Sequence, residues 1–304
     1  MQFMVDPGAD ATIGGMCACA ASGTAAVKYG TMRENVMAMT VVLPSTSIAT
    51  TTCTTEPHST TDAGLPSICY LGCNALKSSA GYNLSALLTG SEGTLGVITD
   101  VTVKLHPIPS HVIAASCAFP DLHSAANAVA TIRMMGIPVS RIELLDEMSI
   151  QAFNHSLAME EDGGGGGGGG EVQRVQSMEV TPTLFIEFAS HSEVAALEDL
   201  AAAQNICIND FGGSKFASAS DEPTRKSLWA ARHRLYYSAI ALRSSSDDEE
   251  GPTSQSTIVT DVCVPLSRFA EIISATAKDV REFGVVGPWY VCWFLSTAFP
   301  FKQS

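Results

Sequence analysis

Apolar and polar residues alternate most regularly in the segment 97–105. One row of this alternation holds Val97, Thr99, Val101, Val103 and Leu105, and the other holds Ile98, Asp100, Thr102 and Lys104. A period of two predicts a half-buried strand, which is more typical of an antiparallel than of a parallel sheet. A short helix is predicted just upstream, over residues 83–88, with Asn83 as its N-cap.

The loop 90–96, GSEGTLG, joins this helix to the strand and contains three glycines. Glycine lets a backbone approach a ligand closely, and Thr94 and the loop N–H groups can donate hydrogen bonds to it. A tight helix-to-strand turn without a ligand explains the same composition. The loop matches neither a dinucleotide-binding glycine motif nor a P-loop, so on its own it leaves both interpretations open.

Small residues crowd the segment 5–36. A loosely packed, turn-rich segment explains this density. The alternative is a backbone wrapped closely around a pyrophosphate, where side chains would collide and N–H groups must reach the anion. Further on, residues 41–43 predict a short strand, and the Thr- and Ser-rich stretch 45–76 predicts an irregular surface loop.

Strands and helices alternate in the part of the chain beyond Pro109. This order predicts an α+β layer, in which an antiparallel sheet carries helices on one side. Eight consecutive glycines at 163–170 and an acidic stretch at 244–253 predict flexible or solvated insertions. The predicted strands are 111–119, 139–145, 182–190 and 257–264, and the predicted helices are 122–135, 146–157, 192–203, 221–242 and 266–283.

The longest predicted helix, 221–242, carries an arginine inside its apolar stripe. Arg232 lies on the face of Leu228 and Leu235, four residues after one and three before the other. A cation in such a stripe must find an anion or extend to solvent. It either forms a structural salt bridge or clamps a substrate carboxylate, which a planar guanidinium matches with two donors. Tyr236, one turn on, either lines the same pocket or is a half-buried core residue.

Composition limits the possible partners. A chain of 304 residues holds about two domains. Its 31 acidic and 17 basic residues give a formal net charge of −14, which argues against nucleic acid or an anionic membrane as partner. Nine cysteines include Cys17-x-Cys19 and Cys69-x3-Cys73, but neither has a matching second pair. We therefore expect free thiols in a reducing compartment rather than a zinc site.

The two ends of the chain carry no predicted signal peptide or membrane span. Met1 is followed by Asp6 without a basic region or an apolar core, so no signal or transit peptide is predicted. The apolar stretch 285–301 is interrupted by Pro288 and Pro300 and is shorter than the roughly 20 residues of a membrane helix. We expect it not to span a membrane.

Three stretches together resemble a known family. They are residues 5–36 (VDPGADATIGGMCACAASGTAAVKYGTMRENV), 90–99 (GSEGTLGVIT) and 228–232 (LWAAR). The chain resembles the FAD-linked oxidases with a vanillyl-alcohol-oxidase (PCMH) type of FAD-binding domain, and among them the FAD-dependent D-2-hydroxy-acid dehydrogenases of the mitochondrial, cytochrome-linked D-lactate type. The likeness covers most of residues 5–44, 78–160 and 181–287.

The resemblance implies two domains and a reaction. Residues 1–107 would be part of a PCMH-type FAD-binding domain, and 108–304 a ferredoxin-like α+β substrate domain, incomplete at its C-terminus. The implied reaction is FAD-dependent oxidation of a D-2-hydroxy acid, D-lactate, with electrons passed to an acceptor such as cytochrome c in mitochondria. Relatives acting on glycolate or D-2-hydroxyglutarate remain alternatives.

The resemblance also implies site residues. Arg232 would bind the substrate carboxylate. We further expect the 90–98 turn and the 14–23 segment to lie side by side as one wall of a flavin groove. The residues implied to lie along FAD are Pro7, Gly8, Thr12, Gly14, Gly15, Ala18, Ser22, Gly23, Tyr29, Gly30, Glu92, Gly96, Val97 and Ile98.

The chain departs from the family pattern in three places. The stretch 45–76 replaces a compact, basic connection. After 284–287 the chain reads Pro-Trp-Tyr-Val, where the family carries Gly-His-x-Gly-Asp-Gly-Asn-x-His, so the ligands of the family's divalent metal are not found. The first half of the FAD domain and the transit segment would precede Met1. These departures predict the middle part of such an enzyme with weak or absent FAD retention, or alternatively a non-catalytic remnant.

Overall fold

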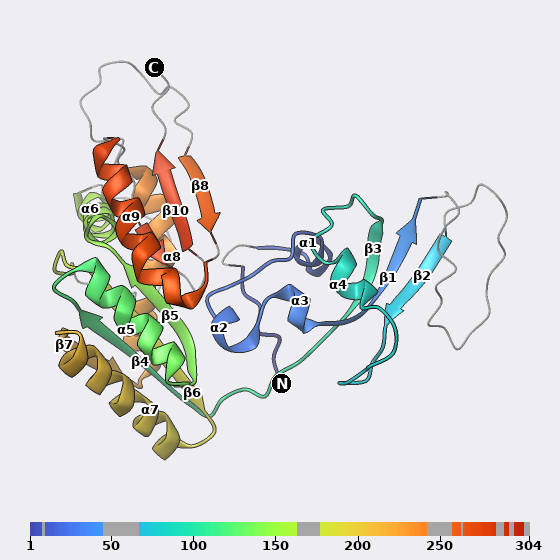
Figure 1. Ribbon diagram of the computed structural model, residues 1–304, viewed down its shortest axis with the longest axis horizontal. Helices are drawn as coiled ribbons and strands as arrows, with labels where there is room; N and C mark the ends of the chain where they lie inside the picture. The colour runs from blue at the N-terminus through green and yellow to red at the C-terminus, as the bar shows by residue number, and fades with distance from the viewer. Residues whose placement is uncertain are drawn as a thin grey trace. The chain divides into compact units, whose positions relative to one another are not determined.

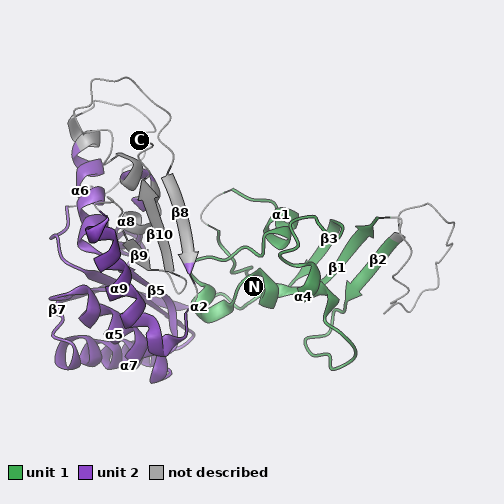
Figure 2. Ribbon diagram, turned by 45° about the horizontal axis from the view of Figure 1, so that its top comes forward, with its two compact units in different colours: residues 1–108 green, residues 109–304 purple. Residues whose placement is uncertain are grey.

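The computed structural model describes residues 1–7, 10–44, 67–162, 177–241, 257–262, 264–283, 289–291 and 295–300. The chain forms two compact units, Met1–Ile108 and Pro109–Ser304 (Figure 2). Each unit has its own antiparallel sheet and its own buried apolar side chains. Each therefore has a core of its own.

Unit 1 is built on a small antiparallel sheet. Its elements are α1 (Ile13–Ala18), α2 (Ala26–Tyr29), α3 (Met32–Asn35), β1 (Val36–Leu43), β2 (Ser67–Gly72), α4 (Leu84–Leu88) and β3 (Val97–Val103). The strand order is β2-β1-β3 (Figure 1). Both strand pairs are antiparallel, which confirms the expectation for β3. Asn83 caps α4 as predicted, because its side chain accepts a hydrogen bond of 3.0 Å from Ala86 N.

The predicted faces of β3 are wrong at its start. Val97 is 65 % exposed, whereas Ile98 packs with the core. The cause is a bulge: Thr40 pairs with Asp100 and the next residue, Val41, pairs with Ile98, so Thr99 is an extra residue in β3. An extra residue reverses the alternation, and Ile98 thereby joins the core face of Val101.

The strand prediction for the middle of unit 1 is too short. β1 begins at Val36 rather than at residue 41, and β2 occupies 67–72, where an irregular loop was expected. β2 forms because its backbone pairs with β1 from Ala38↔Gly72 to Leu43↔Ser67, a long-range pairing that local composition does not report. Residues 45–66 lie outside the described part of the chain.

Unit 2 is built on a larger antiparallel sheet with the order β7-β4-β6-β5-β9-β10-β8. All strand pairs that the structure describes in it are antiparallel, which confirms the predicted α+β class. Its strands are β4 (His111–Ala118), β5 (Val139–Leu145), β6 (Thr183–Ser190), β7 (Ser214–Ala219), β8 (Thr257–Val262), β9 (Trp289–Val291) and β10 (Leu295–Pro300). Its helices are α5 (Leu122–Met134), α6 (Glu147–Asp162), α7 (Glu193–Asn205), η1 (Ile206–Asp210), α8 (Glu222–Ala241), η2 (Leu266–Arg268) and α9 (Phe269–Glu282).

Most elements of unit 2 follow the sequence prediction. Helix caps account for the good agreement at helix starts: Asp121, Ser192 and Asp221 each accept a hydrogen bond from the first turn of α5, α7 and α8. β7 was not predicted. β9 and β10 lie in the stretch 285–301, for which the only prediction was that it does not span a membrane. The glycine run and the acidic stretch 244–253 lie outside the described residues.

Helices cover both faces of the unit 2 sheet, so the expected one-sided arrangement is wrong. Phe185 of β6 packs with Trp229 and Leu235 of α8 on one face. On the other face Leu184 pairs across to Cys117, whose thiol is hydrogen-bonded to that of Cys207 in η1. The physical reason is that β6 is buried at every position from Thr183 to Ala189, and a strand apolar on both faces needs two covering layers.

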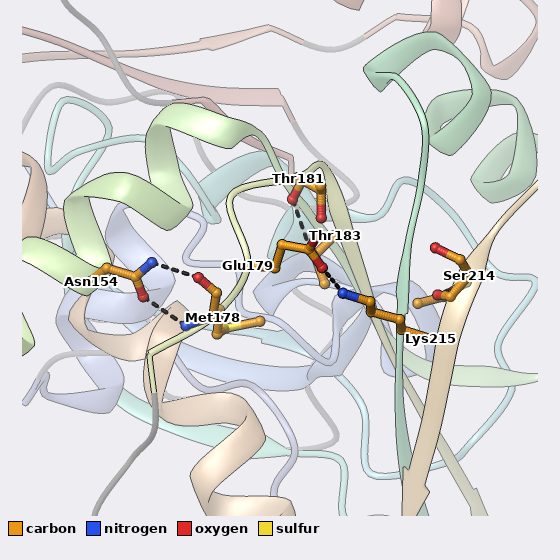
Figure 3. Close-up of polar contacts among 8 residues, drawn as sticks. Asn154, Met178, Glu179, Thr181, Thr183, Ser214 and Lys215 are labelled. Atoms are coloured by element: carbon orange, nitrogen blue, oxygen red, sulfur yellow. Dashed lines mark hydrogen bonds and ion pairs between the residues drawn. The ribbon is translucent and has the colours of Figure 1, made fainter.

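Side-chain contacts fix the segment that leads into β6 (Figure 3). The Asn154 amide of α6 makes two hydrogen bonds with the backbone of Met178, at 2.6 and 2.8 Å. Glu179 forms an ion pair with Lys215 of β7. These contacts hold the chain at residues 178 and 179, just before the central strand β6 begins at Thr183.

Candidate functional site

The first candidate site is formed by α1 and the chain around it. Thr12 begins the helix: its hydroxyl accepts a hydrogen bond of 3.1 Å from Gly15 N, and its carbonyl accepts one of 2.9 Å from Met16 N. Met16 and Cys17 face the core, and burial raises the pKa of the Cys17 thiol to about 11. The opposite side of α1, which includes Thr12 and Gly15, is exposed.

The loop 90–96 lies against the C-terminal end of α1. Gly90 N donates to Cys17 O and Glu92 N donates to Ala18 O, both at 2.9 Å. The predicted juxtaposition of the two glycine-rich segments is therefore confirmed, whereas their role as a flavin wall stays a prediction. Positive φ angles of 86°, 50° and 76° at Gly90, Glu92 and Gly93 give the loop its turn. A non-glycine residue at such an angle costs about 1–2 kcal/mol, and such strain is concentrated at functional sites.

Two predicted ligand residues have clear packing roles. A Cβ at Gly96 would lie 2.8 Å from Val41 Cγ1 and 2.9 Å from Val42 O, and a Cβ at Gly23 would lie 2.0 Å from Asp6 O. A Cβ at Gly14 or Gly93, by contrast, would meet nothing within 4 Å. Gly14 and Gly93 therefore leave open space beside exposed backbone, which is where a ligand could approach.

The other predicted residues of unit 1 are distributed along the same chain segments. Pro7 and Val97 are exposed, Ser22 is half-buried, and Gly8 lies outside the described residues. Gly30 has a φ of 77° after α2. Tyr29 stacks edge-on against His106, with ring centroids 4.9 Å apart. Thr12, Gly14, Gly15, Ala18 and Glu92 are thus brought together around α1, while Tyr29 belongs to a second cluster.

That second cluster is a buried polar network that the sequence did not indicate. Asn35, fully buried, donates from its amide nitrogen to Tyr29 O and Thr31 O, each at 2.8 Å. Its amide oxygen therefore faces His106 Nε2, 2.9 Å away, which must carry the proton. Burial and the charge of Lys104 lower the pKa of His106. The only sequence signal was a polar residue, Asn35, between a helix and a strand.

Unit 1 is expected to lose stability as the pH falls through about 6.5. Because the folded pKa of His106 is lowered, the unfolded state binds more protons in this window, and folding stability is fully present only above it. The thermal midpoint should fall more between about pH 7.5 and 5.5 in the wild type than in His106→Gln, which keeps a donor but does not titrate. His191→Gln, at an exposed position, is the control; an equal pH response of all three proteins would contradict the prediction.

The second candidate site is the face of the unit 2 sheet that α8 covers. Arg141 of β5 and Glu187 of β6 are cross-strand partners, with Nη1 and Oε2 3.6 Å apart. The Ser140 hydroxyl donates to Glu187 Oε1 at 3.1 Å and to its carbonyl at 2.8 Å. Ser140 reaches it because it is the extra residue of a bulge in β5. The Arg141 guanidinium carbon lies 5.6 Å from the centre of the Trp229 ring, a cation–π distance.

Arg232, which is predicted to bind the substrate carboxylate, belongs to α8 and follows Trp229 by three residues. Its side chain lies outside the described part of the structure. Trp229 and Leu235, three residues to either side, pack on the sheet face with Phe185 and Leu145. Position 232 of the helix therefore lies on the same face of α8 as these two packed residues. The sequence did contain a signal for this site that was not used. It is the presence of charged residues, Arg141 and Glu187, inside the otherwise apolar strands β5 and β6.

Within the part of the chain that the structure describes, no helix has the length and apolarity needed to cross a bilayer. Within the same residues, His, Cys, Asp and Glu side chains do not gather in a group of three or more that could hold a metal ion.

The antiparallel sheets and covering helices place the chain in the α+β class, and comparison with solved structures agrees. Alkyldihydroxyacetonephosphate synthase matches with a TM-score of 0.61 at 20 % identity, over 95 % of this chain and 51 % of that one. p-Cresol methylhydroxylase matches with a TM-score of 0.55 at 12 % identity, over 90 % and 52 %. At these identities the likeness concerns the fold alone.

The family follows from the sequence comparisons. The model described as FAD linked oxidases, C-terminal domain, matches residues 108–295, more than half of the chain. The chain therefore belongs to the FAD-linked oxidase family, as the sequence resemblance predicted, and FAD is the cofactor of that family.

Several relatives of this chain are named D-lactate dehydrogenase. A protein of Danio rerio named "Probable D-lactate dehydrogenase, mitochondrial" is 41 % identical over 288 residues, which cover 95 % of this chain and 49 % of that protein. The Arabidopsis thaliana D-lactate dehydrogenase (cytochrome), mitochondrial, is 36 % identical over 278 residues, 91 % of this chain and 41 % of that protein. The chain thus spans about half the length or less of these curated relatives.

Proposed function

We propose that the protein is a FAD-dependent D-2-hydroxy-acid dehydrogenase that oxidises D-lactate, passes the electrons to a cytochrome and works in mitochondria. In this proposal residues 1–107 are part of the flavin-binding domain and 108–304 are the substrate domain. Support comes from the names of the relatives and from one structural observation. That observation is that position 232 of α8 lies between Trp229 and Leu235, both of which are buried.

The residues around α1 fit a flavin through their backbone rather than through charge. Space is open at Gly14 and Gly93, and the hydroxyl oxygen of Ser91 is buried without a hydrogen-bond partner among the described residues. A flavin nucleotide offers many acceptors and hydroxyl groups to such a surface. When bound, FAD supplies the electron acceptor for the hydride that leaves the α-carbon of the acid.

In the proposed mechanism the chain's own residues bind and orient the acid. Arg232 holds the carboxylate with two parallel donors, and so fixes the direction in which the α-hydrogen points. The loop 90–96 and α1 present the open glycine backbone at Gly14 and Gly93 to the cofactor, because Gly90 N and Glu92 N already donate to α1 carbonyls. The hydroxyl proton must pass to a base, a role that the family pattern gives to a histidine motif for which this chain reads Pro288-Trp289-Tyr290-Val291.

The protein purified from its own source is the material for the test. We expect FAD, released on denaturation, at less than one per protein, and reduction of cytochrome c that depends on D-lactate, with weaker or no reduction by L-lactate, glycolate and D-2-hydroxyglutarate. A preference for glycolate or D-2-hydroxyglutarate would replace the substrate in the proposal. Saturable binding of D-lactate without any turnover would instead favour a carboxylate-binding protein that has no activity. The departure from the family's histidine motif at 288–291 supports this alternative.

A further inference from the structure

Two cysteines that the proposed function does not use lie against each other in unit 2. Cys117 belongs to β4 and Cys207 to η1, and the two residues are 1 % and 0 % exposed. The Cys207 thiol donates a hydrogen bond to the Cys117 sulfur, and the Cys117 thiol donates to Ser214 O at 3.6 Å. The two sulfur atoms are therefore in contact, although a strand and a helical segment far apart in the sequence carry them.

A glycine in the chain after η1 makes this contact possible. A Cβ at Gly213 would lie 2.6 Å from Cys117 Sγ and 2.7 Å from Cys207 O. In addition, Gly213 N donates a hydrogen bond of 2.8 Å to Cys207 O. Any side chain at position 213 would push apart the two segments that carry the thiols, so the close approach of the two cysteines is built into the packing.

The backbone around the two thiols is irregular. η1 is a π-helix, a conformation that is rare and is frequently found at functional sites. Lys215 has a φ of 51°, which strains a residue other than glycine. β4 and β7 also lose their regular register at Cys117, because Ser116 pairs with Ala217 whereas Ala118 pairs with Ser214. Filling a core with two small side chains does not account for these irregularities.

The thiols lie directly below an exposed segment of the chain. Ile208, which follows Cys207, and Ser214, whose carbonyl accepts from Cys117, are both exposed. A small molecule therefore needs only a local opening of residues 208–215 to reach the sulfur atoms. The hydrogen bond from Cys207 lowers the pKa of the Cys117 thiol. Cys117 is thus the better nucleophile of the pair, since the thiolate is the form that attacks an oxidant.

We propose that Cys117 and Cys207 are a reversible oxidation site, at which hydrogen peroxide forms a disulfide that joins η1 covalently to β4. In the first step the Cys117 sulfur attacks one peroxide oxygen, the O–O bond breaks, and a sulfenic acid and one water form. In the second step the Cys207 sulfur attacks that sulfur, the S–O bond breaks, and the disulfide and a second water form. Two thiols thus lose two electrons and two protons, and the peroxide is reduced to water. This inference does not depend on the proposed function.

Peptide mapping of the purified protein after treatment with hydrogen peroxide tests the proposal. The remaining thiols are alkylated, and the protein is then digested without reductant. We expect a linked pair of peptides that contain Cys117 and Cys207, and a thiol reductant should separate them. Because the link closes a long loop of the chain, oxidation should raise the thermal midpoint by roughly 5–10 °C, and reduction should reverse the rise. Cys207→Ala should show neither effect, whereas Cys19→Ser, which removes an exposed thiol, should show both.

The wild type alone can overturn the proposal. Absence of the linked peptides at a peroxide concentration that oxidises the exposed Cys19 completely would show that the buried pair is inert. A disulfide that forms between other cysteines, while Cys117 and Cys207 are still alkylated, would reject it as well. Linked peptides with an unchanged or lower thermal midpoint would overturn the expected joining of η1 to β4. If Cys207→Ala does not fold, the mapping of the wild type still decides, because it needs no variant.

Discussion

Arg232→Lys is expected to lower kcat/KM for D-lactate by about ten- to a hundredfold while leaving the thermal midpoint nearly unchanged. Lysine keeps the positive charge but loses the two parallel donors that fix the plane of a carboxylate. That plane determines where the α-hydrogen points relative to the flavin. The loss of one charged hydrogen bond at a partly buried site is worth roughly 1.5–3 kcal/mol, which corresponds to the expected range of rates.

The experiment requires steady-state kinetics and thermal unfolding of the same preparations. Arg234→Lys is the matched control, because residue 234 is two positions on in α8 and points about 200° away from residue 232. The control should retain both activity and stability. A large fall in the thermal midpoint of Arg232→Lys with unchanged activity per folded molecule would identify a structural salt bridge and end the clamp hypothesis.

Local signals predicted the elements of unit 2 well. Asp221 caps α8 by accepting from Thr224 N at 2.9 Å, and its neighbours supply an uninterrupted helical sequence. β5 matches its predicted range of 139–145 at both ends. Such features depend on a few adjacent residues, and the sequence displays them directly. The loop 90–96 and α4 in unit 1 were predictable for the same reason.

Long-range pairing explains what the sequence did not reveal. The extra residue Thr99 in β3 is defined only by its register against β1. β2 is a strand because β1 lies beside it. The polar networks of the candidate sites join residues far apart in sequence: His106 and Asn35 are 71 residues apart, and Ser140 and Glu187 are 47 apart. Periodicity within one segment cannot report a partner in another segment.

The glycines of unit 1 show how one pattern can serve two purposes. Gly14 and Gly23 were both predicted to lie along FAD, yet their surroundings differ. Gly23 packs so closely on Asp6 that a Cβ would lie 2.0 Å from its carbonyl oxygen, whereas a Cβ at Gly14 would meet nothing within 4 Å. The first glycine is required by the fold itself. The second is not, and therefore is the better indicator of a ligand.

Gly23→Ala is accordingly expected to destabilise unit 1 by about 3 kcal/mol, since the backbone of one of the two segments must move. Gly14→Ala should leave folding intact or stabilise it by about 0.5–1 kcal/mol, because alanine is favoured over glycine within a helix such as α1. Chemical denaturation of the two variants beside the wild type measures both effects. Equal stability of Gly23→Ala and the wild type would contradict the close packing seen at Asp6.

The same pair of variants separates folding from flavin binding. If the flavin lies against α1, the Gly14→Ala methyl group occupies the open space that the cofactor would use, and FAD bound per protein should fall although the protein is no less stable. Gly93→Ala is a less suitable substitution, because its φ of 76° strains any other residue. Unchanged FAD content in folded Gly14→Ala would place the flavin elsewhere in unit 1, and the open surface beside α1 would then need a different ligand.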